Sequence, residues 1–134
     1  IVDSLVGSEM CIRDRSEIEC LGRSIDPRCS ILQIRPKTGR NHQVRRHVRD
    51  LNHPILHDGD HGDSRVNRWW REHKGLTRLA LHAGIITLPY QGGTLNIHCP
   101  LPKDLMDVFS EMPWWKQATQ TCPLLIARAG SYIL

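Results

Sequence analysis

The sequence predicts an α+β fold, with a mixed, largely antiparallel sheet and flanking helices. Residues 30–35 alternate apolar and polar side chains, as a half-buried strand does. Residues 79–88 and 94–99 alternate again on either side of a Gly-Gly turn, which is typical of an antiparallel hairpin. Residues 41–51 have helical spacing, and residues 66–74 precede a glycine that can end a helix.

Composition limits the chain to one domain. Its 134 residues are 40% hydrophobic, which is enough for a core. The net charge is only +4, so the bulk charge is a weak indicator of function. Its placement says more, because between Arg35 and Arg78 there are eleven Lys/Arg against five Asp/Glu. This local excess favours a polyanionic partner.

Five cysteines, an odd number without a Cys-x-x-Cys pair, argue against a disulfide framework and a zinc site. Free thiols fit a reducing cytosol. No apolar run approaches the roughly 18 residues needed to span a bilayer, and the N-terminus lacks the pattern of a signal peptide. We therefore expect a soluble, cytoplasmic protein with no membrane partner.

The first residues are expected to be non-native. Residues 4–15 resemble a peptide that arises when sequencing-adapter DNA is translated, so we set residues 1–16 aside as an artefact. The alternative is an authentic amphipathic segment, although no helical or strand period is visible there. Residues 17–118 then form the domain, and residues 119–134 are an unassigned tail.

A short strand is expected over residues 17–22, and a loop with Pro27 over residues 24–29. The strand at 30–35, with Leu32 and Ile34 on one face, then leads into a turn at Thr38 and Gly39.

The basic segment from Arg35 to Arg49 is the centre of the sequence. It holds six Lys/Arg and two His without a single carboxylate, so it will attract a polyanion such as a phosphate backbone. The Thr38 hydroxyl can cap the helix over 41–51. In that helix an apolar stripe recurs at Val44, Val48 and Leu51.

On the helical wheel Arg45 falls at the margin of this buried stripe, whereas Arg46 lies on the far side and should be solvated. A half-buried guanidinium needs a carboxylate or phosphate partner. Nothing in the local sequence supplies one, so we expect it from elsewhere in the fold or from a ligand. The alternative is a surface arginine paired with Asp50 at i+5, which is a poor helical spacing.

The loop over residues 55–67 concentrates histidine and aspartate, residue types that can ligate zinc or iron. Its spacing does not reproduce the His-x-His-x-Asp-His pattern of metallo-hydrolases, and no helical His-Glu-x-x-His is present. A solvated loop at the rim of an active site is the main interpretation, and a metal-dependent hydrolase is the alternative. The residues concerned are His57, Asp58, Asp60, His61 and Asp63.

The helix over 66–74, closed by Gly75, presents aromatic side chains among arginines. Trp69 and Trp70 are able to stack on unpaired bases while Arg68 and Arg71 hold phosphate. Equally, both tryptophans can simply pack beneath the loop.

In the hairpin, His82 lies within the first predicted strand, and we interpret it as a hydrogen-bonded structural residue. A final helix is expected from Pro102 to about Met112, with Pro113 ending it.

Three blocks of residues follow one another between about residues 31 and 115. They are Arg35-x-Lys37-Thr38-Gly39-Arg40-x-His42-Gln43-x-Arg45-x-His47, Asn52-His53-Pro54-Ile55-Leu56-x-Asp58 and Leu79-x-Leu81-His82-Ala83. In this order they resemble the RluA-type pseudouridine synthase family. Residues 61–68 and 72–76 resemble in particular the branch of the family that acts on tRNA.

The resemblance implies the C-terminal part of a pseudouridine synthase catalytic domain. Such an enzyme isomerises a uridine within RNA, here tRNA rather than ribosomal RNA, without a metal or an organic cofactor. The family's catalytic aspartate, in a His-Arg-Leu-Asp motif, and its tyrosine motif are absent from this sequence. We therefore expect the chain to be inactive alone and residues 17–118 to fold poorly in isolation. A monomer is expected.

By the same resemblance, Arg45 matches the family arginine that pairs with the catalytic aspartate and keeps it ionised. Arg40, His42 and Gln43 are expected to position the loop and contact RNA, and Leu81 to wall the uracil pocket. The full set of expected RNA-binding residues is Lys37, Arg40, His42, Gln43, Arg46, Arg49, Arg68, Trp69 and Leu81. A rival hypothesis is a non-catalytic RNA-binding module that uses the helix from Arg40 to Arg49 and the two tryptophans.

Overall fold

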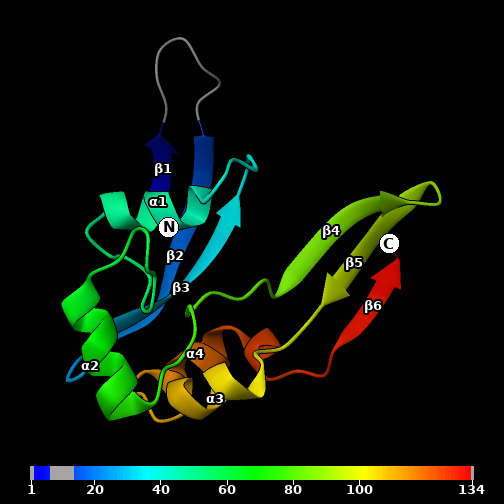
Figure 1. The fold of residues 1–134 in the computed structure, drawn as a ribbon. Coiled ribbons are helices and arrows are strands. Elements are labelled where there is room, and N and C mark those ends of the chain that lie inside the picture. The colour runs from blue at the N-terminus through cyan, green and yellow to red at the C-terminus, as the bar shows by residue number, and fades with distance from the viewer. Residues whose placement is uncertain (1, 7–13, 134) are drawn as a thin grey trace.

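The structure is a computed structural model that describes residues 2–6 and 14–133. It contains two three-stranded antiparallel sheets, which confirms the α+β class, although one continuous sheet was expected (Figure 1). The first sheet is β1 (Val2–Val6), β2 (Asp14–Ile25) and β3 (Arg28–Pro36), and the second is β4 (Ile85–Tyr90), β5 (Gly93–His98) and β6 (Gly130–Ile133). The helices are α1 (Gln43–Asp50), α2 (Ser64–Lys74), α3 (Lys103–Phe109), α4 (Trp115–Thr121) and the 3₁₀ turn η1 (Pro123–Leu125).

A β-bulge divides the long β2–β3 hairpin. Cys20 pairs with Leu32 and Gly22 with Ile31, so Leu21 is the extra residue, and it is buried. Gly22 lies against Trp114 so closely that a Cβ added there would be 2.7 Å from the Trp114 Cβ. The bulge therefore brings the sheet and the segment between α3 and α4 into close packing.

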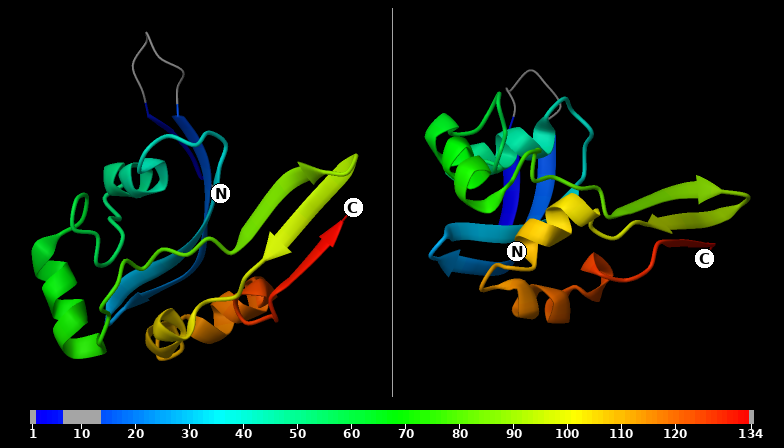
Figure 2. Two further views of the ribbon diagram at one scale, coloured as in Figure 1. Left: turned by 45° about the vertical axis from the view of Figure 1, so that its right-hand side comes forward. Right: turned by 60° about the horizontal axis from the view of Figure 1, so that its bottom comes forward.

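The core lies at the end of the first sheet, where α2, α3 and α4 meet it (Figure 2). The second sheet extends away from this body in every view (Figures 1 and 2). No helix within residues 2–6 and 14–133 is long and apolar enough to cross a membrane. The buried core residues are Leu21, Ile31, Trp70, Leu76, Leu105, Val108, Met112, Trp114 and Ala118.

The predicted hairpin is confirmed, but its first strand was placed too early. Strand β4 begins only at Ile85, and residues 79–84 form an extended segment without a partner strand. Within this segment Ala80 packs against the core, and its N–H donates to the Leu56 carbonyl at 3.0 Å. His82 therefore precedes the strand. Its Nε2 lies 2.9 Å from the Cys99 carbonyl, as a structural histidine would.

Both ends of the chain contribute to the sheets. The last predicted helix ends at Phe109 rather than near Met112. Within the tail at 119–134, residues 119–121 complete α4 and residues 130–133 pair with β5. At the other end, residues 7–13 of the proposed artefact lie outside the described residues, whereas residues 2–6 and 14–16 belong to strands. The non-native origin of residues 1–16 stays a prediction.

Candidate functional site

Arg45 and Asp58 form a bidentate ion pair between α1 and the loop that follows it. The Arg45 Nε donates to Asp58 Oδ2 at 2.8 Å, and Nη2 donates to Oδ1 at 2.6 Å. The same Nη2 donates to Asp60 Oδ2 at 3.1 Å. The Arg45 side chain is 16% exposed and that of Asp58 is 0% exposed. The predicted position of Arg45 at the margin of the buried face is thus confirmed.

The fold supplies this partner by reversing the chain after α1. Asn52 adopts a left-handed backbone with φ 61°, and the His53 N–H donates to the Val48 carbonyl at 2.8 Å. The loop then brings Asp58 back to α1, thirteen residues after Arg45. The alternative pairing of Arg45 with Asp50 is wrong, because Asp50 accepts hydrogen bonds from Arg49.

The buried Asp58 carboxylate is fully satisfied. In addition to the Arg45 bonds, Oδ1 accepts the backbone N–H groups of Asp60 and His61 at 3.0 Å each. The hydrogen bonds from Arg45 hold the pKa of Asp58 far below its usual range, against burial, which would raise it. Asp58 in turn raises the pKa of Arg45. Both groups are therefore charged at every physiological pH.

One nitrogen of the Arg45 guanidinium is unused. Asp58 and Asp60 engage Nε and Nη2, and no residue in the described part of the chain accepts a hydrogen bond from Nη1. Nη1 carries two N–H donors. The pair therefore fixes the orientation of the guanidinium and leaves donors for a second anion.

His61 fastens the same loop to α1. The Arg49 Nη1 lies 3.0 Å from His61 Nδ1, and His61 Nε2 lies 3.0 Å from His42 Nδ1. Because an arginine only donates, His61 Nδ1 accepts, and its Nε2–H donates to His42. His42 immediately precedes α1 and has a left-handed φ of 53°. Two of the expected RNA-binding residues, His42 and Arg49, are thus joined through His61, for which the sequence predicted no contact with α1.

A buried polar cluster supports the turn before α1. Gln43 donates to Ser16 Oγ at 3.0 Å and accepts from Thr38 Oγ1 at 2.6 Å. His47 Nδ1 lies 2.7 Å from the same Ser16 Oγ, and burial lowers the pKa of His47. The predicted cap is wrong, because Thr38 bonds the Gln43 side chain and no side chain among the described residues caps α1. Gln43 is therefore buried, and its side chain holds the turn before α1 in place through hydrogen bonds.

Carboxylates of β2 neutralise part of the basic segment. Asp14 lies 2.9 Å from Arg46 Nη2 and 3.3 Å from Arg40 Nε, and Glu17 lies 3.8 Å from Lys37 Nζ. The expectation that Arg46 is solvated is wrong, since its side chain is only 27% exposed. A helical wheel could not predict this contact, because it contains no information about β2, the strand that lies beside α1.

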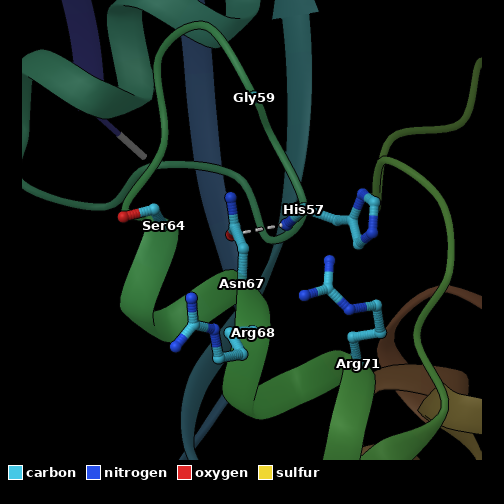
Figure 3. Close-up of a pocket in the computed structure, with 6 residues that line it drawn as sticks. All are labelled: His57, Gly59, Ser64, Asn67, Arg68 and Arg71. Carbon is cyan, nitrogen blue, oxygen red and sulfur yellow. Dashed lines mark hydrogen bonds between the residues drawn. The ribbon is translucent and has the colours of Figure 1, made fainter.

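One face of α2 lines a cavity. Asp63 caps the helix by accepting the N–H groups of Arg65 and Val66, and Gly75, with φ 70°, ends it as predicted. Ser64, Asn67, Arg68 and Arg71 follow the i, i+3, i+4, i+7 spacing of one helical face. Together with His57 and Gly59 they line a cavity of about 300 Å³ (Figure 3).

The two tryptophans of α2 have different environments. Trp70 is 3% exposed within the core, so for this residue the packing alternative is confirmed and contact with bases is ruled out. Trp69 is 39% exposed and stacks on His73, with ring centroids 4.9 Å apart and planes 15° apart. A contact of Trp69 with a base stays a prediction.

Two other expectations concern Leu81 and a metal. Leu81 lies half-buried in the extended segment before β4, where its carbonyl accepts from Arg78 Nη2 at 3.1 Å. Its role in a uracil pocket stays a prediction. Within the described ranges no three His, Cys, Asp or Glu side chains gather as metal ligands, so nothing there favours the metal-dependent hydrolase.

Sequence reasoning named Asp58, His57 and Arg71 but did not predict which residues they lie beside. Asp58 was not linked to Arg45, and His57 was not linked to Arg71. The sequence did contain a signal for Asp58. Arg45 was predicted at the margin of the buried face without a local partner, and Asp58 follows it within one loop. For His57 no local signal exists, because its position beside α2 depends on the path of the loop.

The chain is similar to curated proteins named tRNA pseudouridine synthase C. Over 95 residues it is 42% identical to the protein of Salmonella typhi and 41% identical to that of Salmonella typhimurium, which is 69% of this chain and 36% of each relative. Over 96 residues it is 38% identical to the protein of Yersinia pestis, covering 70% of this chain and 37% of the relative. About 95 residues of this chain are therefore similar to part of each of these proteins.

The chain spans little more than a third of the length of these relatives. No protein-family model matches the chain. The family resemblance expected from the three sequence blocks is confirmed by these similarities.

Proposed function

We propose that this chain is part of an RNA pseudouridine synthase that acts on tRNA. The observation that carries the proposal is the 42% identity over 95 residues to a protein named tRNA pseudouridine synthase C. The basic segment from Arg35 to Arg49, which attracts phosphate, is compatible with an RNA substrate. No metal or organic cofactor is invoked.

In this proposal Arg45 holds the catalytic carboxylate. The family resemblance assigns it that role, and the structure supports the assignment by geometry, since Nη1 keeps two donors while Nε and Nη2 are held by Asp58. A guanidinium fixed in this way would lower the pKa of an approaching carboxylate and keep it ionised as a nucleophile. Asp58 would then act as a positioning residue.

The proposal implies that the chain by itself forms no pseudouridine, because its sequence lacks the His-Arg-Leu-Asp motif. That absence is also the observation that favours the rival function, a non-catalytic RNA-binding module. The two functions differ in whether this chain supports catalysis when a catalytic aspartate is supplied.

A chimera tests this directly. The matched residues of the Salmonella typhi relative are replaced by the corresponding residues of this chain, and pseudouridine is measured in unmodified tRNA. We expect pseudouridine formation by the chimera and none by the 134-residue chain alone. A folded chimera that binds tRNA but leaves every uridine unchanged would favour the RNA-binding module and contradict the proposed function.

A further inference from the structure

Two arginines and the imidazole of His57 surround the cavity beside α2. Figure 3 shows His57, Arg68 and Arg71 around the amide of Asn67, with Ser64 at the start of the helix. Within residues 2–6 and 14–133, neither arginine forms an ion pair or a hydrogen bond, and the His57 ring has no hydrogen-bond partner. In this respect they differ from Arg45 and Arg46, which both have carboxylate partners.

Hydrogen bonds of Asn67 hold the loop that forms one wall of the cavity. The Asn67 Oδ1 accepts the His57 N–H at 2.8 Å, and its Nδ2 donates to the Asp58 carbonyl at 3.0 Å. Asn67 thereby clamps the loop to α2 and fixes the cavity wall. His57 has a left-handed φ of 63°, a conformation that this clamp holds beside the helix.

The carboxylates that neighbour the lining residues in sequence do not pair with the arginines of the cavity. Asp58 and Asp60 contact Arg45, and Asp63 accepts the first N–H groups of α2. Glu72 stands at i+4 from Arg68 but forms no ion pair with it. The cavity therefore presents two guanidiniums, an imidazole and a hydroxyl to solvent.

We propose that this cavity, formed by His57, Ser64, Arg68 and Arg71, binds a phosphate group of the RNA backbone. Arginine forks suit phosphate oxygens, and the serine hydroxyl and imidazole add donors. A volume of about 300 Å³ has room for a nucleotide phosphate and its sugar. The proposal rests on the proposed function for its choice of RNA. It adds a contact point on α2, separate from the guanidinium of Arg45 on α1.

The test compares charge-neutral variants of the full chain for tRNA binding as a function of salt concentration. Arg68→Gln with Arg71→Gln removes both guanidiniums, and Arg65→Gln is the matched control, because Arg65 lies on the same exposed helix but outside the cavity lining. We expect the double variant to bind tRNA about 10-fold more weakly with a salt slope smaller by about 1 to 2. The control should stay within about twofold. Arg68→Lys with Arg71→Lys should regain part of the affinity.

A second measurement uses inorganic phosphate and NMR. Phosphate should shift the backbone amide signals of Ser64 and Asn67 in the unsubstituted chain and in the Arg65→Gln variant, and not in the double variant. Phosphate could shift these signals while the double variant and the control bind tRNA equally well. That result would contradict RNA as the ligand and favour a free phosphate compound. If neither measurement separates the double variant from the control, the site itself is overturned. Failure of the proposed function would instead appear as an inactive chimera. The binding measurements on the arginine variants do not use the chimera, so the two failures can be told apart.

Discussion

Asp58 holds Arg45 along one edge of its guanidinium, through contacts of 2.8 and 2.6 Å, while Arg45 Nη1 has no acceptor in the described part of the chain. The carboxylate is fully buried and accepts two further backbone N–H groups, so it is the fixed member of the pair. A buried ion pair is most sensitive to the loss of one partner. The pair should therefore stabilise the loop after α1 and fix the orientation of the Arg45 guanidinium.

Asp58→Asn should destabilise the chain strongly. The amide keeps one oxygen acceptor, but its NH₂ group faces the donors of Arg45 and leaves the guanidinium without a counter-charge. We predict a fall of about 10 °C or more in the midpoint of thermal unfolding measured by circular dichroism. Asp60→Asn is the control, because its side chain is 68% exposed and its effect should stay below about 3 °C. Equal effects of the two variants would contradict the central position of Asp58.

The Asp58 carboxylate should also give the chain an acid-dependent stability. Its pKa is depressed in the folded state, so below the unfolded value of about 3.9 the unfolded chain binds a proton that the folded chain does not. The stabilisation is fully present above about pH 5 and is lost as the pH falls toward the lower folded pKa. Urea unfolding between pH 6 and pH 2.5 should show a steeper loss for the unsubstituted chain than for Asp58→Asn. Parallel curves would show that the pair is not formed in solution.

His47 should contribute a second pH dependence at higher pH. Burial lowers the pKa of His47 in the folded state. As the pH falls through about 6.5, His47 therefore takes up a proton more readily in the unfolded chain than in the folded chain. Stability should therefore fall as the pH drops from 7.5 to 5.5. His47→Gln should remove this part of the slope, although it also alters the bond to Ser16. Urea midpoints at three pH values measure it, and an unchanged slope in the variant would argue against a buried neutral His47.

Gly22→Ala should disturb the core at the β-bulge. The added Cβ would meet the Trp114 Cβ at 2.7 Å, so the sheet or the tryptophan has to shift. Overpacking of this kind lowers the free energy of unfolding by about 1 to 3 kcal/mol. Gly39→Ala is the matched control, because nothing lies within 4 Å of the Cβ it adds. Chemical denaturation of both variants should separate them; similar values would mean that the bulge is not packed as described.

Local signals were sufficient for several elements. The Gly75 that follows the helical pattern of α2 ends the helix with a left-handed φ of 70°, as its missing Cβ allows. The hairpin of β4 and β5 follows from alternation on either side of a turn, and Gln91 and Gly92 supply the positive φ values of that turn. The marginal position of Arg45 follows from helical geometry alone.

Contacts between distant segments could not be predicted in this way. The Arg46 ion pair with Asp14 spans 32 residues and depends on the placement of α1 against β2. The anion cavity depends on a clamp between Asn67 and His57, which no periodicity in α2 reveals. Residues 79–84 alternate in sequence but belong to no strand of the structure, because side-chain periodicity contains no information about backbone partners.

The rate of pseudouridine formation by the chimera carrying Arg45→Met, compared with the unsubstituted chimera, tests the central proposal most directly. We predict a loss of about 100-fold or more in rate at saturating tRNA, with tRNA affinity changed by less than about threefold, because the guanidinium acts on the catalytic carboxylate rather than on the RNA. Arg65→Met removes a charge from an exposed position of α2 and should keep most of the rate. An Arg45→Met chimera that is folded and as fast as the unsubstituted one would contradict the role proposed for Arg45.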